Sequence, residues 1–173
     1  MSALSPLGII HTAISLLALG AGLCALLRDG RISPANGAGK LYVGATVLSC
    51  ASSLFIFAHG GFGKPHALAI ITLATLAFAA VVRWKALFGH AAAAVETVLY
   101  SLTILFSMIP AVTETFTRLP AGAPVFDSPD AAALALINGA MFCVFVAASV
   151  WQVRVLRARR RADGGADAGR RTA

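Results

Sequence analysis

Three of the four histidines are spaced so that they could meet at one end of a helical membrane bundle. His59 and His66 flank a short glycine-rich segment, and His11 lies seven residues into the first apolar segment. Glu114 follows the fourth apolar segment. If each apolar segment crosses the membrane, all four side chains lie at the outer face. Imidazole and carboxylate groups are the usual ligands of zinc, copper and iron. We therefore predict a metal site formed by His11, His59, His66 and Glu114.

The same histidines are also consistent with a haem b site. Two imidazoles from separate helices can hold haem iron on its two axial sides. His11, His59 and His66 are the predicted cofactor ligands in this case, while His90 lies near the other face without a histidine partner. The sequence contains no H-E-x-x-H motif. A histidine at a membrane interface can also be a simple capping residue, so the absence of a cofactor remains an alternative.

Two sets of polar residues recur at steps of three and four within apolar segments. They are Tyr42, Thr46, Ser49 and Ser53 in the second segment, and Glu96, Tyr100, Thr103 and Ser107 in the fourth. These steps place each set on one helical face. Because polar groups are costly in lipid, we predict that both faces lie inside the bundle. Helix packing accounts for serine and threonine, but it does not require the carboxylate of Glu96, which also allows a path for protons or a ligand.

The composition indicates which elements must position these residues. Apolar residues make up 58% of the 173-residue chain and charged residues 12%, against roughly 45–50% and about 25% in globular proteins. Apolar segments at residues 4–27, 41–58, 66–82, 91–112 and 131–153 are each near the length that crosses a hydrocarbon core. We predict an all-α, polytopic transmembrane bundle of five helices over residues 1–153. A four-helix bundle, with the fourth segment on the membrane surface, is the alternative.

The distribution of basic residues predicts the orientation. Of the 14 lysines and arginines, only Lys64 and Arg118 fall outside when the C-terminus is cytoplasmic, which is a strong positive-inside bias. We predict a protein of the bacterial inner membrane with its N-terminus outside. Residues 154–173 should form a disordered, basic cytoplasmic tail that contacts anionic lipid. The net charge of +7 does not indicate nucleic acid, because the sequence carries no nucleic-acid-binding motif.

Residues 11–73 resemble a family of bacterial inner-membrane proteins of unknown function. The resemblance rests on the early His11, a G-x-x-Y sequence from Gly39 to Tyr42, and the hairpin from His59 to His66. It implies a small helical bundle, often of four helices. It implies no substrate and no catalytic residue.

Three hypotheses for the function follow. The first is a metal- or haem-binding protein that serves electron transfer or oxidase maturation. The second is a scaffold or accessory subunit that is not an enzyme and holds no cofactor. The third is a small transporter that uses the Glu96 face, although five helices are few and no inverted repeat is visible. The sequence predicts the lipid bilayer as a partner, but neither a partner protein nor a reaction.

Overall fold

The protein is built of helices, as the sequence predicts. A computed structural model describes residues 6–56 and 61–171, with the side chains of the last helix described as far as Ala162. In chain order the elements are α1 (Pro6–Asp29), α2 (Gly37–Ser53), α3 (Lys64–Trp84), the short 3-10 helix η1 (Gly89–Ala91), α4 (Ala92–Arg118) and α5 (Ala132–Arg171). The described residues contain no strand, so the predicted all-α fold is confirmed.

Four helical segments are long and apolar enough to cross a membrane. They are Pro6–Asp29, Lys64–Trp84, Gly89–Arg118 and Ala132–Ala162, and they give the chain the character of an integral membrane protein. Helix α2 is shorter, with 17 residues that extend about 25 Å at 1.5 Å per residue, which is the lower end of the length that crosses a membrane. The four-helix alternative placed the fourth apolar segment on the membrane surface. In the structure the shortest of the five α-helices is the second.

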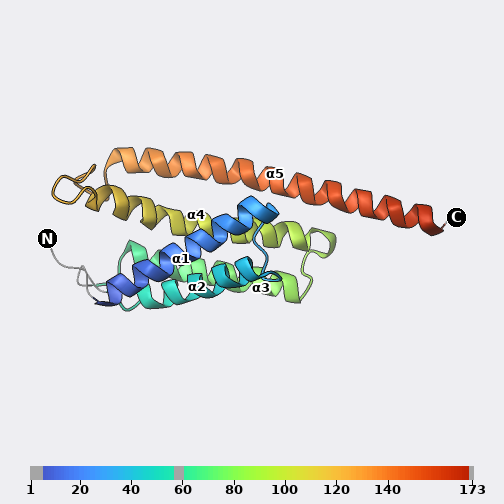
Figure 1. Cartoon of the computed structure of the whole chain (residues 1–173), viewed down its shortest axis with the longest axis horizontal. Helices are drawn as coiled ribbons and strands as arrows, with labels where there is room; N and C mark the ends of the chain where they lie inside the picture. The colour runs from blue at the N-terminus through green and yellow to red at the C-terminus, as the bar shows by residue number, and fades with distance from the viewer. Residues whose placement is uncertain (1–5, 57–60, 172–173) are drawn as a thin grey trace.

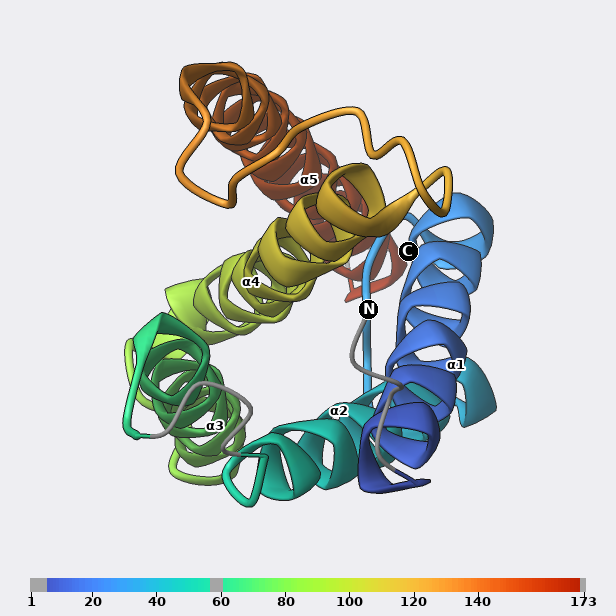
Figure 2. The ribbon, with the colours of Figure 1, turned by 90° about the vertical axis from the view of Figure 1, so that its left-hand side faces the viewer.

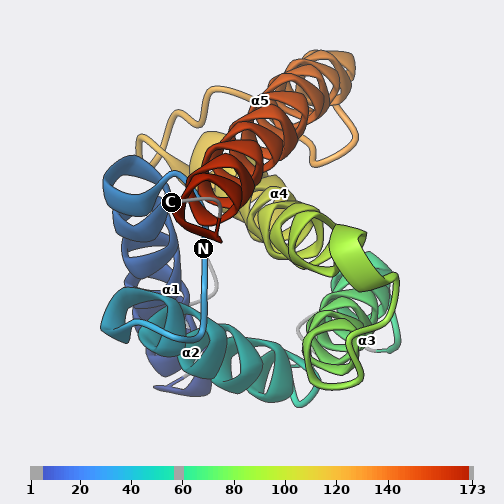
Figure 3. The same cartoon turned by 90° about the vertical axis from the view of Figure 1, so that its right-hand side faces the viewer.

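Helices α1 to α4 are arranged as a ring, and α5 lies outside it against α4 (Figure 2). Each helix packs against the next one along the chain, and a smaller contact between α1 and α4 closes the ring. Figure 3 shows the same arrangement from the other end. The α1–α2 and α3–α4 connections lie at the right of Figure 1, toward the C-terminus, and we call this the basic end. The α2–α3 and α4–α5 connections lie at the opposite end.

Two tyrosines and small side chains fill the ring. Tyr42 and Tyr100 are almost fully buried and pack in one cluster with Ile104, Leu76 and three alanines. Gly22 of α1 faces this cluster, and a Cβ atom there would come within 2.8 Å of the Tyr42 ring. The absence of a side chain at Gly22 therefore lets α1 approach Tyr42 closely.

Several helix ends differ from the predicted segments, and α2 ends at Ser53 rather than at 58. Helix α2 begins at Gly37 because the Asn36 side chain accepts a hydrogen bond from the Gly39 amide at 2.8 Å, as an N-cap does. Helix α4 continues through Pro110 to Arg118, beyond the predicted end at 112. Helix α5 continues without a break to Arg171, so the segment expected to be a disordered tail is helical where the structure describes it.

Candidate functional site

A polar contact inside the ring joins α2 to α4. The hydroxyl groups of Tyr42 and Thr103 lie 2.8 Å apart, and neither residue is exposed. Thr103 Oγ1 also donates to the carbonyl of Tyr100 at 2.8 Å. Since a hydroxyl has one proton, Tyr42 must be the donor to Thr103. This hydrogen bond ties together the two polar faces that the sequence predicted.

Glu96 lies on the same side of α4, nearer the basic end. It is 7% exposed, and its Oε2 lies 3.8 Å from Nη1 of Arg83 at the end of α3. Ser107, half-buried, donates to the Thr103 carbonyl of its own helix at 3.0 Å. Glu96, Tyr100 and Thr103 are thus buried, and the carboxylate of Glu96 has a cationic partner at the edge of the bundle.

His11 faces α2 rather than an open site. Its Nδ1 lies 3.1 Å from the Ser49 carbonyl and 3.0 Å from Ser52 Oγ. Because a carbonyl oxygen can only accept, Nδ1 carries the proton and Nε2 of the neutral ring is left with a lone pair. Ser15 Oγ and Ser49 Oγ, 2.6 Å apart, add a second link between α1 and α2. His11 Nε2, which lies 3.5 Å from Ser15 Oγ, is therefore the ring atom with a lone pair that could bind a metal.

The other predicted metal ligands are spread around the opposite end. Glu114 is close enough to His11 for an electrostatic interaction, but its carboxylate also pairs with Arg118 one turn later. His66 is buried at the start of α3, and its Nδ1 accepts from the Gly63 amide at 3.3 Å. His59 lies outside the described residues. Among the residues that are described, no three metal-ligating side chains gather, and α1 does not contact α3.

Gln152 of α5 makes a polar link that the sequence analysis did not identify. Its Oε1 accepts from Ser101 Oγ of α4, and its Nε2 donates to the carbonyl of Gly30, both at 2.9 Å. The side chain is 4% exposed. A side-chain amide within an apolar segment was the available signal, because such a group needs a partner in a membrane, although Asn138 of the same segment gave an equal signal.

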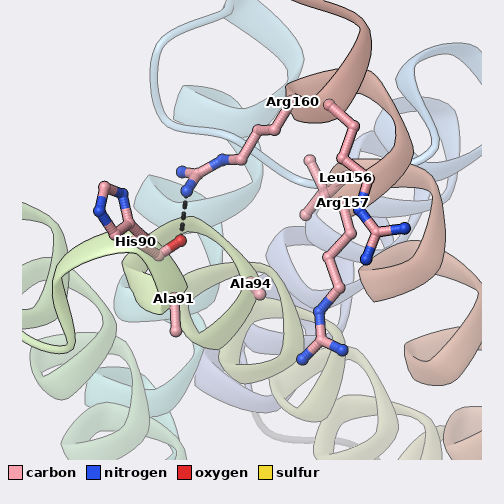
Figure 4. Close-up of a pocket in the computed structure, with 7 residues that line it drawn as sticks. His90, Ala91, Ala94, Leu156, Arg157 and Arg160 are labelled. Atoms are coloured by element: carbon pink, nitrogen blue, oxygen red, sulfur yellow. Dashed lines mark hydrogen bonds between the residues drawn. The ribbon is translucent and has the colours of Figure 1, made fainter. Parts of the chain in front are cut away.

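Two adjoining cavities lie between α4 and α5 at the basic end. The first, of about 280 Å³, is lined by His90, Ala91 and Ala94 on one side and by Leu156, Arg157, Arg160 and Arg161 on the other (Figure 4). In this view the Arg160 guanidinium donates to the His90 carbonyl. The second cavity, of about 310 Å³, is lined by Val98, Ser149, Val150, Val153, Arg154 and Arg157. Arg157 lines both cavities, so they are neighbours along one groove.

Comparisons with known proteins do not add a function. No family model matches the chain, and no curated protein or solved structure is significantly similar to it. The predicted resemblance to a family of bacterial inner-membrane proteins gains no support from them. The function must therefore be argued from the geometry of this chain.

Proposed function

We propose that this protein is a small accessory subunit or scaffold of the bacterial inner membrane that is not itself an enzyme. Its N-terminus lies outside and its C-terminus in the cytoplasm. The basic residues at the α1–α2 and α3–α4 connections and along the second half of α5 support this orientation, because positive charge favours the cytoplasmic side. Arg31, Lys40, Arg83 and Lys85 all belong to the basic end.

The observation that carries the proposal is the position of α5. Helices α1 to α4 form a ring, and the hydroxyl groups of Tyr42 and Thr103 inside it bond to each other. Among the helices α5 contacts only α4, its one hydrogen bond elsewhere among the described residues is that of Gln152 with Gly30, and its spanning segment is the least buried of the four. Leu136, Phe142 and Val144 are large apolar side chains exposed on it. A helix that contributes so little to its own bundle is suited to contact a second membrane protein.

Site-specific photocrosslinking in living cells tests this proposal. A photoreactive residue at Val144, 69% exposed on α5, is compared with one at Leu16, 64% exposed on α1. We expect one discrete protein adduct from Val144 and only lipid adducts from Leu16. Lipid adducts alone from both positions would exclude the accessory role.

A metal- or haem-binding role is the second candidate. The lone pair on His11 Nε2 and the nearby Glu114 carboxylate support it. The test is elemental analysis of the purified protein together with absorbance in the Soret region. A stoichiometric metal or haem that is lost in His11→Ala would establish this role in place of the first. Absence of both groups from protein purified directly from membranes would remove it.

A further inference from the structure

The groove between α4 and α5 has the form of a lipid site. Opposite α5 it is lined by His90 and Ala91 of η1 and by Ala94 and Val98 of α4. On the α5 side it runs from Ser149 to Arg161, about 18 Å at 1.5 Å per residue. This length is a little more than half of a hydrocarbon core about 30 Å thick, so the groove extends through about one leaflet.

The charges along the groove are all of one sign. Arg154, Arg157, Arg160 and Arg161 line it, and no aspartate or glutamate does. None of these arginines pairs with a carboxylate among the described side chains. Arg160 is partly committed to the His90 carbonyl, whereas Arg157 lies between the two cavities. A guanidinium binds phosphate oxygens well because its N–H groups form a planar fork.

The polarity of the groove changes along its length. Its second cavity is lined by Val98, Val150 and Val153 and by the hydroxyl of Ser149, with Arg154 and Arg157 at the end that adjoins the first cavity. Among the described residues Ser149 Oγ has no hydrogen-bond partner. Arginines above and valines below match the order of groups in a phospholipid, from phosphate to acyl chain. A soluble anion would use the arginines and leave the valines uncovered.

We propose that the α4–α5 groove binds one anionic phospholipid of the cytoplasmic leaflet, with its phosphate at Arg157 and an acyl chain along Val98 and Val153. The inference rests on the orientation given under the proposed function, and not on the accessory role. Basic pockets between membrane helices are a recognised form of lipid site. The site holds the lipid where α4 and α5 meet, so the lipid would add to the contact between these two helices.

Native mass spectrometry of the full-length protein tests the site. The protein is released from a neutral detergent that contains equal amounts of phosphatidylglycerol and phosphatidylcholine. We expect one phosphatidylglycerol to be retained in preference. Arg157→Gln should weaken its binding about fivefold, which corresponds to about 1 kcal/mol for one basic residue at an anionic surface. Arg159→Gln is the matched control, because Arg159 lies on the same basic helix but lines neither cavity.

A second variant separates the groove from diffuse attraction. Ala94→Phe keeps every charge but fills the first cavity, and it should also abolish the preference for phosphatidylglycerol. An equal loss in Arg159→Gln, or no preference in the unmodified protein, would overturn the proposal. Displacement of the lipid by glycerol phosphate would show that the groove binds a soluble anion instead. The orientation is tested separately by reporter fusions, so the two proposals can fail independently.

Discussion

At the scale of single residues, the interior of the ring depends on the close packing of α1 at Gly22, where an added Cβ atom would meet Ile104 of α4 as well as Tyr42 of α2. Gly22 faces the Tyr42 ring, and an added Cβ atom would lie 2.8 Å from it. The Tyr42 ring cannot move aside easily, because Tyr42 is fully buried and its hydroxyl is bonded to Thr103. This position therefore tolerates no side chain without a shift of one helix.

Gly22→Ala should lower the stability of the protein in detergent by about 1–3 kcal/mol, the usual cost of overpacking a core. Gly20→Ala is the matched control on the same helix, since a Cβ atom there meets nothing within 4 Å. The control should be stabilising by up to about 1 kcal/mol, because alanine favours a helix over glycine. The measurement is the unfolding midpoint of each variant in denaturant. Equal effects at the two glycines would contradict the close packing.

Tyr42→Phe removes the donor to Thr103 and nothing else from the core. We expect a loss of about 1 kcal/mol, as for a typical buried hydrogen bond. Tyr100→Phe is the control, because among the described residues the Tyr100 hydroxyl makes no hydrogen bond although the residue is 2% exposed. Thermal unfolding of both variants gives the comparison. A larger loss in Tyr100→Phe would show that the Tyr42 contact is not important.

The sequence could show which residues are polar and share a face, but not which helix each one meets. Tyr42 and Ser49 belong to one predicted face of the second segment. In the structure Tyr42 reaches α4 and Ser49 reaches α1. A polar face covers a wide part of the helix circumference, so its residues can contact the neighbouring helices on both sides. Helical spacing alone therefore could not predict that His11 contacts Ser49 and not His66.

At the scale of elements, the docking of α5 depends on Gln152. Gln152→Leu would leave the Ser101 hydroxyl and the Gly30 carbonyl without this partner. We expect a loss of about 1–3 kcal/mol and faster proteolysis within the connection at residues 119–131, since α5 would separate from α4 more often. Ser149→Ala, one turn away, should change neither the rate of proteolysis nor the stability. Unchanged proteolysis of Gln152→Leu would show that the apolar contacts with α4 suffice.

Helix ends were predicted less well than the helices themselves. Length and apolar character identify a membrane helix. They do not show where a capping residue begins the helix or whether it continues through a polar last turn. The predicted second segment begins at residue 41, whereas the Asn36 cap places Gly37 and Gly39 in α2 as well. Beyond Val112, α4 continues through threonines and Glu114, which are polar but compatible with a helix at a membrane surface. The apolar segment of the sequence ends where the hydrocarbon core of the membrane would end, whereas the helix itself continues beyond that point.

At the scale of the whole molecule, the orientation is a direct prediction. Reporter fusions after Phe62 and Val125 should report the outside, and fusions after Ser33, Trp84 and Ala162 should report the cytoplasm. The expected pattern follows from the basic end of the bundle, where arginine and lysine would oppose transfer across the membrane. A cytoplasmic signal at Val125 would mean that α4 and α5 do not both span. An outside signal at Ala162 would reverse the orientation.

The bond from Gln152 to Gly30 also bears on how the chain is made. It joins residues 122 positions apart, and at 5–20 residues per second a ribosome needs about 6–24 s to add that length. During this interval α1 and α2 have already left the ribosome, and the Gly30 carbonyl must rely on water or on another group. The bundle therefore completes its basic end only after the last helix has been synthesised. Biogenesis of this protein ends with the joining of its first loop to its final helix.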